Sequence, residues 1–176
     1  MSLPQEPKPA KLVIGLFMSA KSLLEKAAVQ LESPFGPIDM VSPWMNFDYT
    51  TYYEPEMGAP LFRRVFTFEN LIQQYDLAKI KITTNRIEQN YSHNGKRSIN
   101  IDPGYLLHER FVLASGKNFS HRIYIGDGIY ADLTLLYSGG NFQKLPWTYP
   151  DYADRPMLTF LKRVRNRYVL EYSPER

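Results

Sequence analysis

The stretch His121-Arg-Ile-Tyr-Ile-Gly-Asp-Gly-Ile-Tyr-Ala-Asp-Leu-Thr-Leu135 carries two β-prone runs on either side of Gly126-Asp127-Gly128. Isoleucine, tyrosine and threonine are enriched in strands, and a glycine-rich tripeptide between two such runs is typical of a hairpin loop. The stretch therefore predicts a β-hairpin, from which the rest of the sheet can be built outward.

The alternation of side chains decides the register of this hairpin. Successive side chains of a strand point to opposite faces, so a three-residue loop over Gly126–Gly128 is the choice that separates apolar from polar positions. It pairs Ile125 with Ile129, Ile123 with Ala131 and His121 with Leu133 on one face, and Tyr124 with Tyr130, Arg122 with Asp132 and Ser120 with Thr134 on the other. Two interpretations of the polar face stay open: a solvated sheet surface, or the floor of a pocket.

The run before the hairpin also contributes polar groups. In Ser98-Ile-Asn-Ile-Asp102, Asn100 and Asp102 alternate with isoleucines, and Pro103-Gly104 is expected to end the strand. Asp102 is either a catalytic or ligand-binding carboxylate or the cap of the Pro-Gly turn. A further strand leads to Lys117, which we expect at the rim of the hairpin.

The composition is that of a soluble globular protein. Of the 176 residues, 44% are hydrophobic and 22% are charged, and there is no cysteine, which excludes disulfides, cysteine nucleophiles and thiolate metal sites. We see no apolar run long enough to span a membrane and no signal peptide, so we expect a cytoplasmic protein without membrane contact. The net charge of +3 permits an anionic ligand but does not by itself indicate nucleic acid.

The N-terminal pattern sets the fold class. Residues 1–10 contain three prolines and read as a flexible tail, followed by one domain over residues 11–176. The apolar run Leu12–Phe17 predicts a strand buried on both faces, and apolar residues recur at helical spacing from Leu23 to Leu31. We predict an α+β fold: a single, mostly antiparallel (mixed) sheet with an initial β-α unit and helices packed on one face. That covered face carries Ile99, Ile123, Ile129 and Leu133.

Two central segments carry charges with competing interpretations. Glu54 and Glu56 flank Pro55, and in an extended chain both carboxylates point the same way, which suits binding of a divalent cation or acid–base work. An exposed acidic loop is the favoured interpretation, because Pro55 indicates a loop or a sheet edge. The spacing from Leu77 to Tyr91 predicts a helix that places Lys81, Asn85 and Glu88 on one face. A solvated helix surface accounts for these three residues.

The C-terminal part combines an aromatic loop with a basic helix. Trp147, Tyr149 and Tyr152 lie in a proline-rich loop that either covers a pocket or fills an edge of the core. The last helix is expected to begin at Asp154 and to carry an apolar stripe. Its basic residues are Lys162, Arg163, Arg165 and Arg167, which fit a solvated face or contact with phosphate or nucleic acid.

Several common catalytic and binding motifs are missing. The chain has no phosphate-loop motif, no Gly-x-Gly-x-x-Gly, no His-Glu-x-x-His and no Gly-x-Ser-x-Gly, and its three histidines show no metal-ligand spacing. These absences argue against P-loop NTPases, dinucleotide-dependent enzymes, zincin metalloproteases and serine hydrolases with a nucleophile elbow.

A run of shorter motifs is spread over nearly the whole chain. These are Glu56-Met-Gly58, Lys81 with Thr84-Asn85 and Glu88, Arg97 with Asn100-x-Asp-Pro-Gly-Tyr105, Lys117 with His121-Arg-Ile-Tyr124, Gly128-Ile-Tyr130, and Thr148-Tyr-Pro-Asp-Tyr152. With these motifs the chain resembles, from about Lys11 to Tyr168, a family of uncharacterised bacterial proteins, domain of unknown function 4416. Some members of that family carry a GTP-binding label, so the resemblance implies nucleotide binding as one expectation.

Two classes of function follow from these patterns. The first is an enzyme or binder for a phosphorylated or otherwise anionic small molecule such as a nucleotide. Its candidate ligand-binding residues are Arg97, Asn100, Lys117, His121, Arg122, Tyr124 and Tyr130, with Asp102 and Asp132 as candidate catalytic carboxylates and Glu54 and Glu56 as candidate ligands of a divalent cation. The second is a non-catalytic module that binds protein or RNA through the tyrosine-rich face and the basic last helix. Convergence of the polar groups in one concave pocket favours the first, and their dispersal over a flat surface favours the second.

Overall fold

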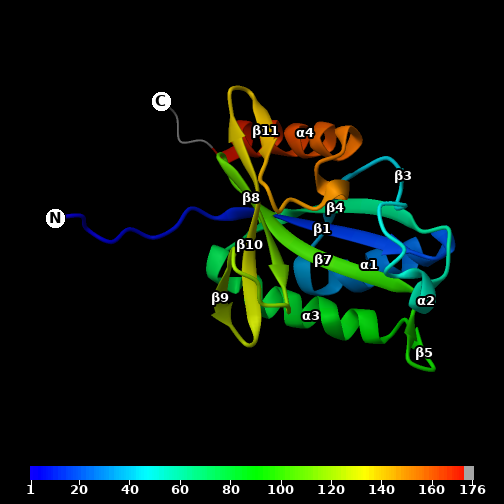
Figure 1. The fold of residues 1–176 in the computed structure, drawn as a ribbon. Helices are drawn as coiled ribbons and strands as arrows, with labels where there is room; N and C mark the ends of the chain where they lie inside the picture. Colours follow the sequence, from blue (N-terminus) through cyan, green and yellow to red (C-terminus); the bar gives the residue numbers. More distant parts are fainter. Residues whose placement is uncertain (173–176) are drawn as a thin grey trace.

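A nine-stranded antiparallel sheet dominates the computed structural model, which describes residues 1–172 (Figure 1). Its strands are β1 (Ala10–Met18), β2 (Ile38–Val41), β3 (Met45–Asn46), β4 (Phe62–Ile72), β7 (Ile99–Leu106), β8 (Arg110–Ser115), β9 (Arg122–Gly126), β10 (Ile129–Ser138) and β11 (Asn141–Lys144). The helices are α1 (Leu24–Phe35), α2 (Glu54–Met57), α3 (Leu77–Gln89) and α4 (Arg155–Tyr172), and β5 (Ser92–His93) with β6 (Lys96–Arg97) forms a separate small hairpin. The expected α+β class is confirmed.

The central strands follow a split β-α-β plan. The strand order is β11-β10-β8-β7-β1-β4-β2, with β3 beside β4 and β9 beside β10. β1 and β2 are both antiparallel to β4, which lies between them, and β4 and β7 are both antiparallel to β1, which lies between these two. The order β1-α1-β2-β4-α3-β7 is therefore the βαββαβ arrangement of ferredoxin-like folds, extended by β8 to β11.

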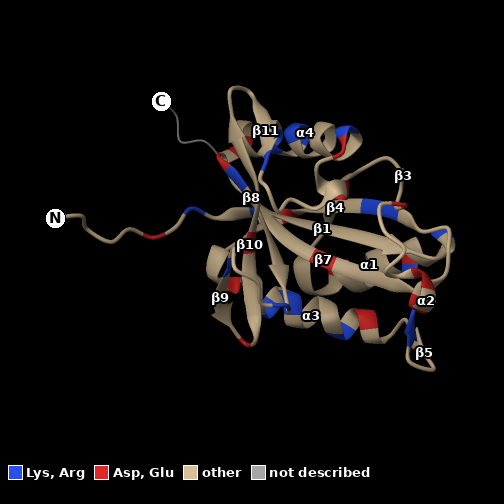
Figure 2. Ribbon diagram, in the orientation of Figure 1, with Lys and Arg blue, Asp and Glu red and all other residues tan. Residues whose placement is uncertain are grey.

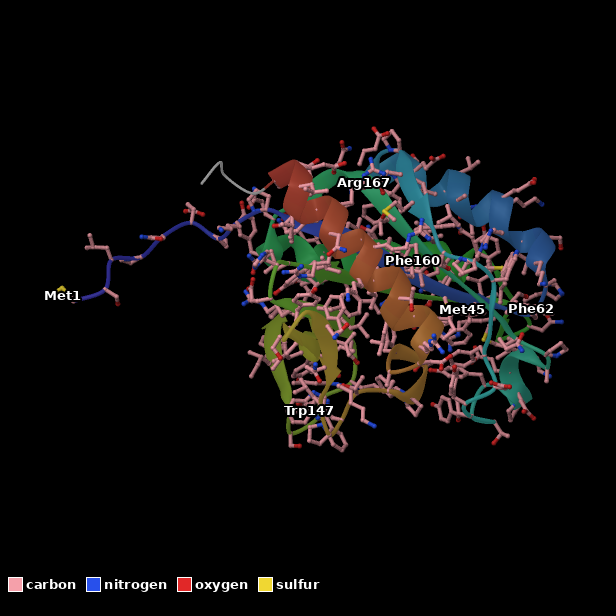
Figure 3. The ribbon with its side chains drawn as sticks, turned by 90° about the horizontal axis from the view of Figure 1, so that it is seen from above. Met1, Met45, Phe62, Trp147, Phe160 and Arg167 are labelled. Carbon is pink, nitrogen blue, oxygen red and sulfur yellow. The ribbon has the colours of Figure 1, made fainter. Side chains whose placement is uncertain are left out.

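The two faces of the sheet are covered differently. On one face, α1 and α3 pack against Leu12, Ile14 and Leu16 of β1, as expected for helices on one side. On the other face, α4 crosses the sheet with Phe160 pointing into a core shared with Val13 (Figure 3). Because α4 covers only part of this second face, the remainder is free to form a site.

The second face is interrupted where β8 leaves β7. β8 pairs with β7 only at Gly104–Leu106, so the preceding part of β7 has β1 on one side and, within residues 1–172, no strand on the other. Pro103 lacks a backbone N–H, which suits the point where pairing stops. A Cβ on Gly104 would lie 2.4 Å from the carbonyl oxygen of Val112, so glycine allows the two strands to approach. The prediction that Pro103-Gly104 ends the strand is wrong, because β7 continues to Leu106.

The hairpin has the predicted register beyond its loop. Tyr130 pairs with Tyr124, Ala131 with Ile123 and Asp132 with Arg122. The loop itself differs, because Ile129 pairs with Gly126 and not with Ile125, and a bulge follows. Asp127 and Gly128 both have positive φ (52° and 74°), the geometry of a two-residue turn whose twist suits a hairpin. The bulge restores the register that the three-residue loop was meant to provide.

The helical covering does not extend to the hairpin margin. Ile129 is buried as expected, but Ile123 is 68% exposed because β9 is an edge strand that pairs, in the described part of the chain, with β10 alone. The expectation that helices cover Ile123 is therefore wrong. None of the described helices is long and apolar enough to cross a membrane.

Candidate functional site

A cleft of about 870 Å³ opens on the second face of the sheet, where β7 and β8 separate. We call it the β7–β8 cleft. Its walls come from β7 (Asn100, Asp102), α3 (Lys81, Asn85, Glu88), the end of β8 (Ser115), the β8–β9 connection and hairpin (Lys117, Arg122, Asp132), the segment 47–53 and the loop 149–152. Six candidates from the sequence line this one cavity: Arg97, Asn100, Asp102, Lys117, Arg122 and Asp132.

Two side chains of α3 take the place of a neighbouring strand at the open edge of β7. The Ile101 N–H donates to a carboxylate oxygen of Glu88, and the Ile101 carbonyl accepts a hydrogen bond of 2.8 Å from the Lys81 ammonium. Buried backbone groups need such partners. Lys81 and Glu88 are 8% and 7% exposed, so the interpretation of this helix face as solvated is wrong.

Arg97 connects two wall elements of the cleft, α3 and β7, to the neighbouring helix α2. Its Nε and Nη2 donate to the two carboxylate oxygens of Glu56 at 2.6 and 2.9 Å, and its Nη1 lies 3.0 Å from Asn100 Oδ1 and 3.4 Å from Glu88 Oε2. Figure 2 shows the acidic residues of α2 beside the basic end of the β5–β6 hairpin. A two-pronged guanidinium–carboxylate pair fixes orientation as well as charge, so Arg97 is a clamp between α2, α3 and β7.

The predicted geometry of Glu54 and Glu56 is wrong. Residues 54–57 form helix α2, in which side chains two positions apart point in different directions. Glu56 is committed to Arg97, and Glu54 is exposed. Among the described residues no group of three or more acidic or histidine side chains is arranged to hold a metal ion.

The two carboxylates that flank Arg97 have opposite pKa shifts. Burial raises the pKa of Glu88 above its ordinary value, although Lys81 and the Ile101 N–H act against the shift. The hydrogen bonds from Arg97 hold the pKa of the more exposed Glu56 carboxyl below its ordinary value. Of these two carboxyls, Glu88 is thus the one that more readily holds a proton.

Asp102 is presented from within β7 and does not cap a turn. Its side chain is 31% exposed to the cleft, and its oxygens accept from Asn100 Nδ2 at 2.6 Å and lie 3.5 Å from Lys81 Nζ. An ionised carboxylate offers about four acceptor positions, so Asp102 retains capacity for a ligand.

Arg122 and Asp132 form a buried pair at the opposite wall. Arg122 Nε lies 2.8 Å from Asp132 Oδ2, and the two side chains are only 6% and 3% exposed. Burial tends to lower the pKa of Arg122, but the hydrogen bonds to Asp132 and Tyr149 raise it overall. His121 Nε2 is 3.2 Å from the same Asp132 oxygen, and its ring stacks on Trp147 at 4.8 Å. The interpretation of the polar face as a pocket floor fits Arg122 and Asp132. His121 contacts Asp132 but does not itself line the cleft.

The two hairpin tyrosines share a face but not the cleft. The ring centroids of Tyr124 and Tyr130 are 5.4 Å apart, as the register predicts. Neither residue lines the cavity, and Tyr124 is 60% exposed. They lie nearer the hairpin tip than Arg122, so the structure does not bring them together with the other candidates.

The rim of the cleft is bridged by Lys117. Its ammonium lies 3.4 Å from the hydroxyl of Tyr52 and 5.0 Å above that ring, which belongs to the segment between β3 and α2. Within residues 1–172, no carboxylate forms an ion pair with Lys117, whereas Lys81 and Arg122 each pair with one carboxylate and Arg97 pairs with two. Lys117 is therefore the cation in the cleft that is available to an anionic group.

At the deep end of the cleft, Tyr152 had been considered from the sequence as a pocket cover or a core-edge residue, whereas Asp151 and Arg63 were not among the candidates. Tyr152 is 3% exposed, lines the cleft and lies against the Arg63 guanidinium at 4.3 Å, and Arg63 forms an ion pair with Asp151. The motif Thr148–Tyr152 belonged to the family resemblance and was a usable signal for Tyr152 and Asp151. Arg63 lay in a strand pattern without any local signal, because its partner is distant in sequence.

The basic residues of α4 are engaged within the protein. Arg165 donates to the His108 carbonyl at 2.6 Å and stacks 3.5 Å from the Tyr137 ring centroid, and Arg167 pairs with Glu171 at 2.6 Å. Lys162 donates to Asn141 at 3.0 Å. These contacts give most of the basic helix a structural role.

Comparisons with known proteins identify the family of this chain but give no function for it. The model of the family described as domain of unknown function (DUF4416) matches residues 8–168, nearly the whole chain. No curated protein and no solved structure matches this chain in these comparisons.

Proposed function

We propose that the β7–β8 cleft of this chain, which belongs to the family described as domain of unknown function (DUF4416), binds an anionic small molecule such as a nucleotide or sugar phosphate. The observation that carries the proposal is the convergence of polar side chains from β7, α3, β10 and two loops into one cavity. A volume of about 870 Å³ lies within the range of small-molecule sites.

The cleft has a polar side and an apolar side, which fits a ligand with two unlike parts. Phe17 stacks on Phe47 with centroids 4.2 Å apart, and Tyr53 packs against Phe17 at 4.7 Å. This aromatic wall suits the face of a ring, while Lys117 and the Arg122 region suit an anionic group. Asp102 and Glu88 are the carboxyls through which a bound ligand could exchange protons, so turnover is part of the proposal.

A thermal-shift screen tests this proposal. Nucleotides, sugar phosphates, inorganic phosphate and divalent cations are added separately to the full chain, and a specific ligand raises the melting temperature by mass action. We expect an anionic compound to give a shift that Lys117→Gln abolishes. Lys144→Gln, at an exposed lysine on β11, is the matched control and should preserve the shift.

The contrary results are equally specific. An unchanged shift in Lys117→Gln, or in Arg122→Ala among molecules that remain folded, would remove the basis for an anion site in this cleft. A response to RNA that is lost with exposed basic residues of α4, such as Arg163, would instead favour the protein- or RNA-binding alternative. Near-UV circular dichroism checks that each variant is folded.

A further inference from the structure

Charge pairing limits how much negative charge the cleft can accept. Four basic side chains line it, Lys81, Arg97, Lys117 and Arg122, and four carboxylates line it with them, Glu88, Asp102, Asp132 and Asp151. Lys81 lies 3.5 Å from Asp102, Arg97 3.4 Å from Glu88 and Arg122 2.8 Å from Asp132. A ligand with several negative charges would therefore meet as many carboxylates as cations, and like charges at close range are strongly unfavourable.

Among the described basic residues that line the cleft, one cation remains for the ligand. Lys117 has the Tyr52 hydroxyl and ring as its neighbours and sits at the rim, so one anionic group can reach it without displacing a carboxylate. The described residues supply no metal-binding cluster that would neutralise a polyphosphate. The charge pattern fits a single phosphate and opposes a triphosphate.

The deep end of the cleft contains a buried hydroxyl without a regular hydrogen bond. The Tyr152 hydroxyl lines the cavity and forms no hydrogen bond of regular geometry within the described protein, although the Arg63 guanidinium beside it acts against the rise in its pKa that burial causes. A Cβ on Gly15 would lie 2.8 Å from this oxygen, and Gly15 pairs with Asp102 across the sheet, which places the hydroxyl above the Gly15–Asp102 pair. An unsatisfied buried hydroxyl is costly and calls for a partner, which a ligand can supply.

The groups around that hydroxyl match the hydrogen-bonding needs of a sugar. Asp102 retains acceptor positions, and the Tyr152 and Tyr53 phenols can donate. Burial, with a contribution from the negative charge of Asp102, raises the pKa of Tyr53 to about 12, so this phenol keeps its proton at neutral pH. A sugar hydroxyl donates and accepts at once, so a carboxylate beside phenols satisfies both roles.

We infer that the cleft takes a phosphate monoester of a polyhydroxylated ring, with the ring hydroxyls at Asp102 and Tyr152 and the single phosphate at Lys117. This inference rests on the proposed function and narrows it: the ligand is a sugar phosphate or a nucleoside monophosphate, and nucleoside triphosphates are rejected. The two sources share the ring hydroxyls and the monoester, and they differ in whether a base occupies the aromatic wall.

Isothermal titration calorimetry with five probes tests the inference on the full chain. The probes are ribose 5-phosphate, glucose 6-phosphate, GMP, GTP and inorganic phosphate. We expect at least one phosphate monoester of a sugar or nucleoside to bind, GTP to bind roughly tenfold more weakly than GMP, and inorganic phosphate to bind more weakly than the best monoester. Preference for GMP over both sugar phosphates identifies a nucleoside monophosphate, and the reverse order identifies a sugar phosphate.

The variant Tyr152→Phe provides a second readout that needs no ligand. Removing a buried hydroxyl without a regular hydrogen bond should leave the melting temperature of the free protein unchanged or raised, while monoester binding weakens about fivefold. Tyr75→Phe, at a 66% exposed tyrosine outside the cleft, should change neither property. A clear loss of stability in free Tyr152→Phe would show that the hydroxyl already has a partner and would overturn the inference.

Failure of the inference can be told from failure of the proposed function. Binding of GTP as tight as that of GMP, or unchanged monoester binding in Tyr152→Phe, with all binding still lost in Lys117→Gln, leaves the anion site standing and rejects the sugar subsite. Absence of binding by every phosphorylated probe rejects both.

Discussion

The two halves of strand β7 show how one strand can serve stability at one end and a site at the other. From Gly104 to Leu106 its backbone pairs with β8. At Ile101 the same edge is satisfied by Lys81 and Glu88 of α3. A strand neighbour closes the sheet, whereas side-chain partners leave room beside it, and the cleft occupies that room. The difference shows that the site depends on where β8 stops pairing.

The largest effect on stability is expected in the half of β7 that pairs with β8, because the two strands pack tightly there. Gly104→Ala places a Cβ 2.4 Å from the Val112 carbonyl oxygen, so β7 and β8 must move apart. We expect a loss of about 3 kcal/mol in the free energy of unfolding, measured by urea denaturation. Gly116→Ala is the matched control, because a Cβ there meets nothing within 4 Å. Equal stability of both variants would mean that the strands are not in close contact at Gly104.

The stability of the open half of β7, around Ile101, should depend on Glu88, which binds the Ile101 backbone in place of a neighbouring strand. Glu88→Ala leaves the buried Ile101 N–H without an acceptor and removes one carboxylate from Arg97, at an expected loss of about 2 kcal/mol. Glu88→Gln retains a side-chain oxygen and should lose less. Hydrogen exchange of the Ile101 amide reports the contact directly: we expect faster exchange in the alanine variant, and an unchanged rate would show that Glu88 does not protect this edge.

The two carboxylates beside Arg97 should give pH dependences of opposite sign. Burial raises the folded-state pKa of Glu88 above its ordinary value of 4.5, so its contribution to stability is full below that value and is lost as the pH rises through the folded-state pKa. The folded-state pKa of Glu56 is lowered, so its contribution is present above 4.5 and is lost as the pH falls through the folded-state pKa.

Urea unfolding across the acid range measures this contrast. Relative to wild type, Glu88→Gln should gain stability as the pH rises above about 4.5, and Glu56→Gln should gain as the pH falls below it. Each variant is the control for the other, because both remove one carboxylate from Arg97. Parallel profiles would contradict the assignment of a buried and a guanidinium-paired carboxyl.

The smallest expected effect on stability is at the rim. Lys117 is exposed and has no carboxylate partner in residues 1–172, so Lys117→Gln should change the free energy of unfolding by less than about 0.5 kcal/mol. Its effect should appear only in the ligand-dependent thermal shift. A large loss of stability without ligand would make the Tyr52 contact a structural one.

The sequence pattern predicted the structure correctly where residues close together in the chain determine it. The alternation in the hairpin predicted that Arg122 and Asp132 pair, and the apolar spacing from Leu77 predicted α3. It failed where partners are distant in sequence. Glu88 looked solvated because the amide that it binds lies on β7, and Pro103-Gly104 looked like a strand end because the approach of Val112 is a tertiary contact.

The most direct test of the account is a ¹H–¹⁵N NMR titration of the full chain with the phosphate monoester that binds best. The account predicts shifts concentrated at residues 100–102, 114–117 and 149–152, on both sides of the gap between β7 and β8, with α1 and β2 unaffected. Shifts confined to α4 or to the hairpin tip would contradict it.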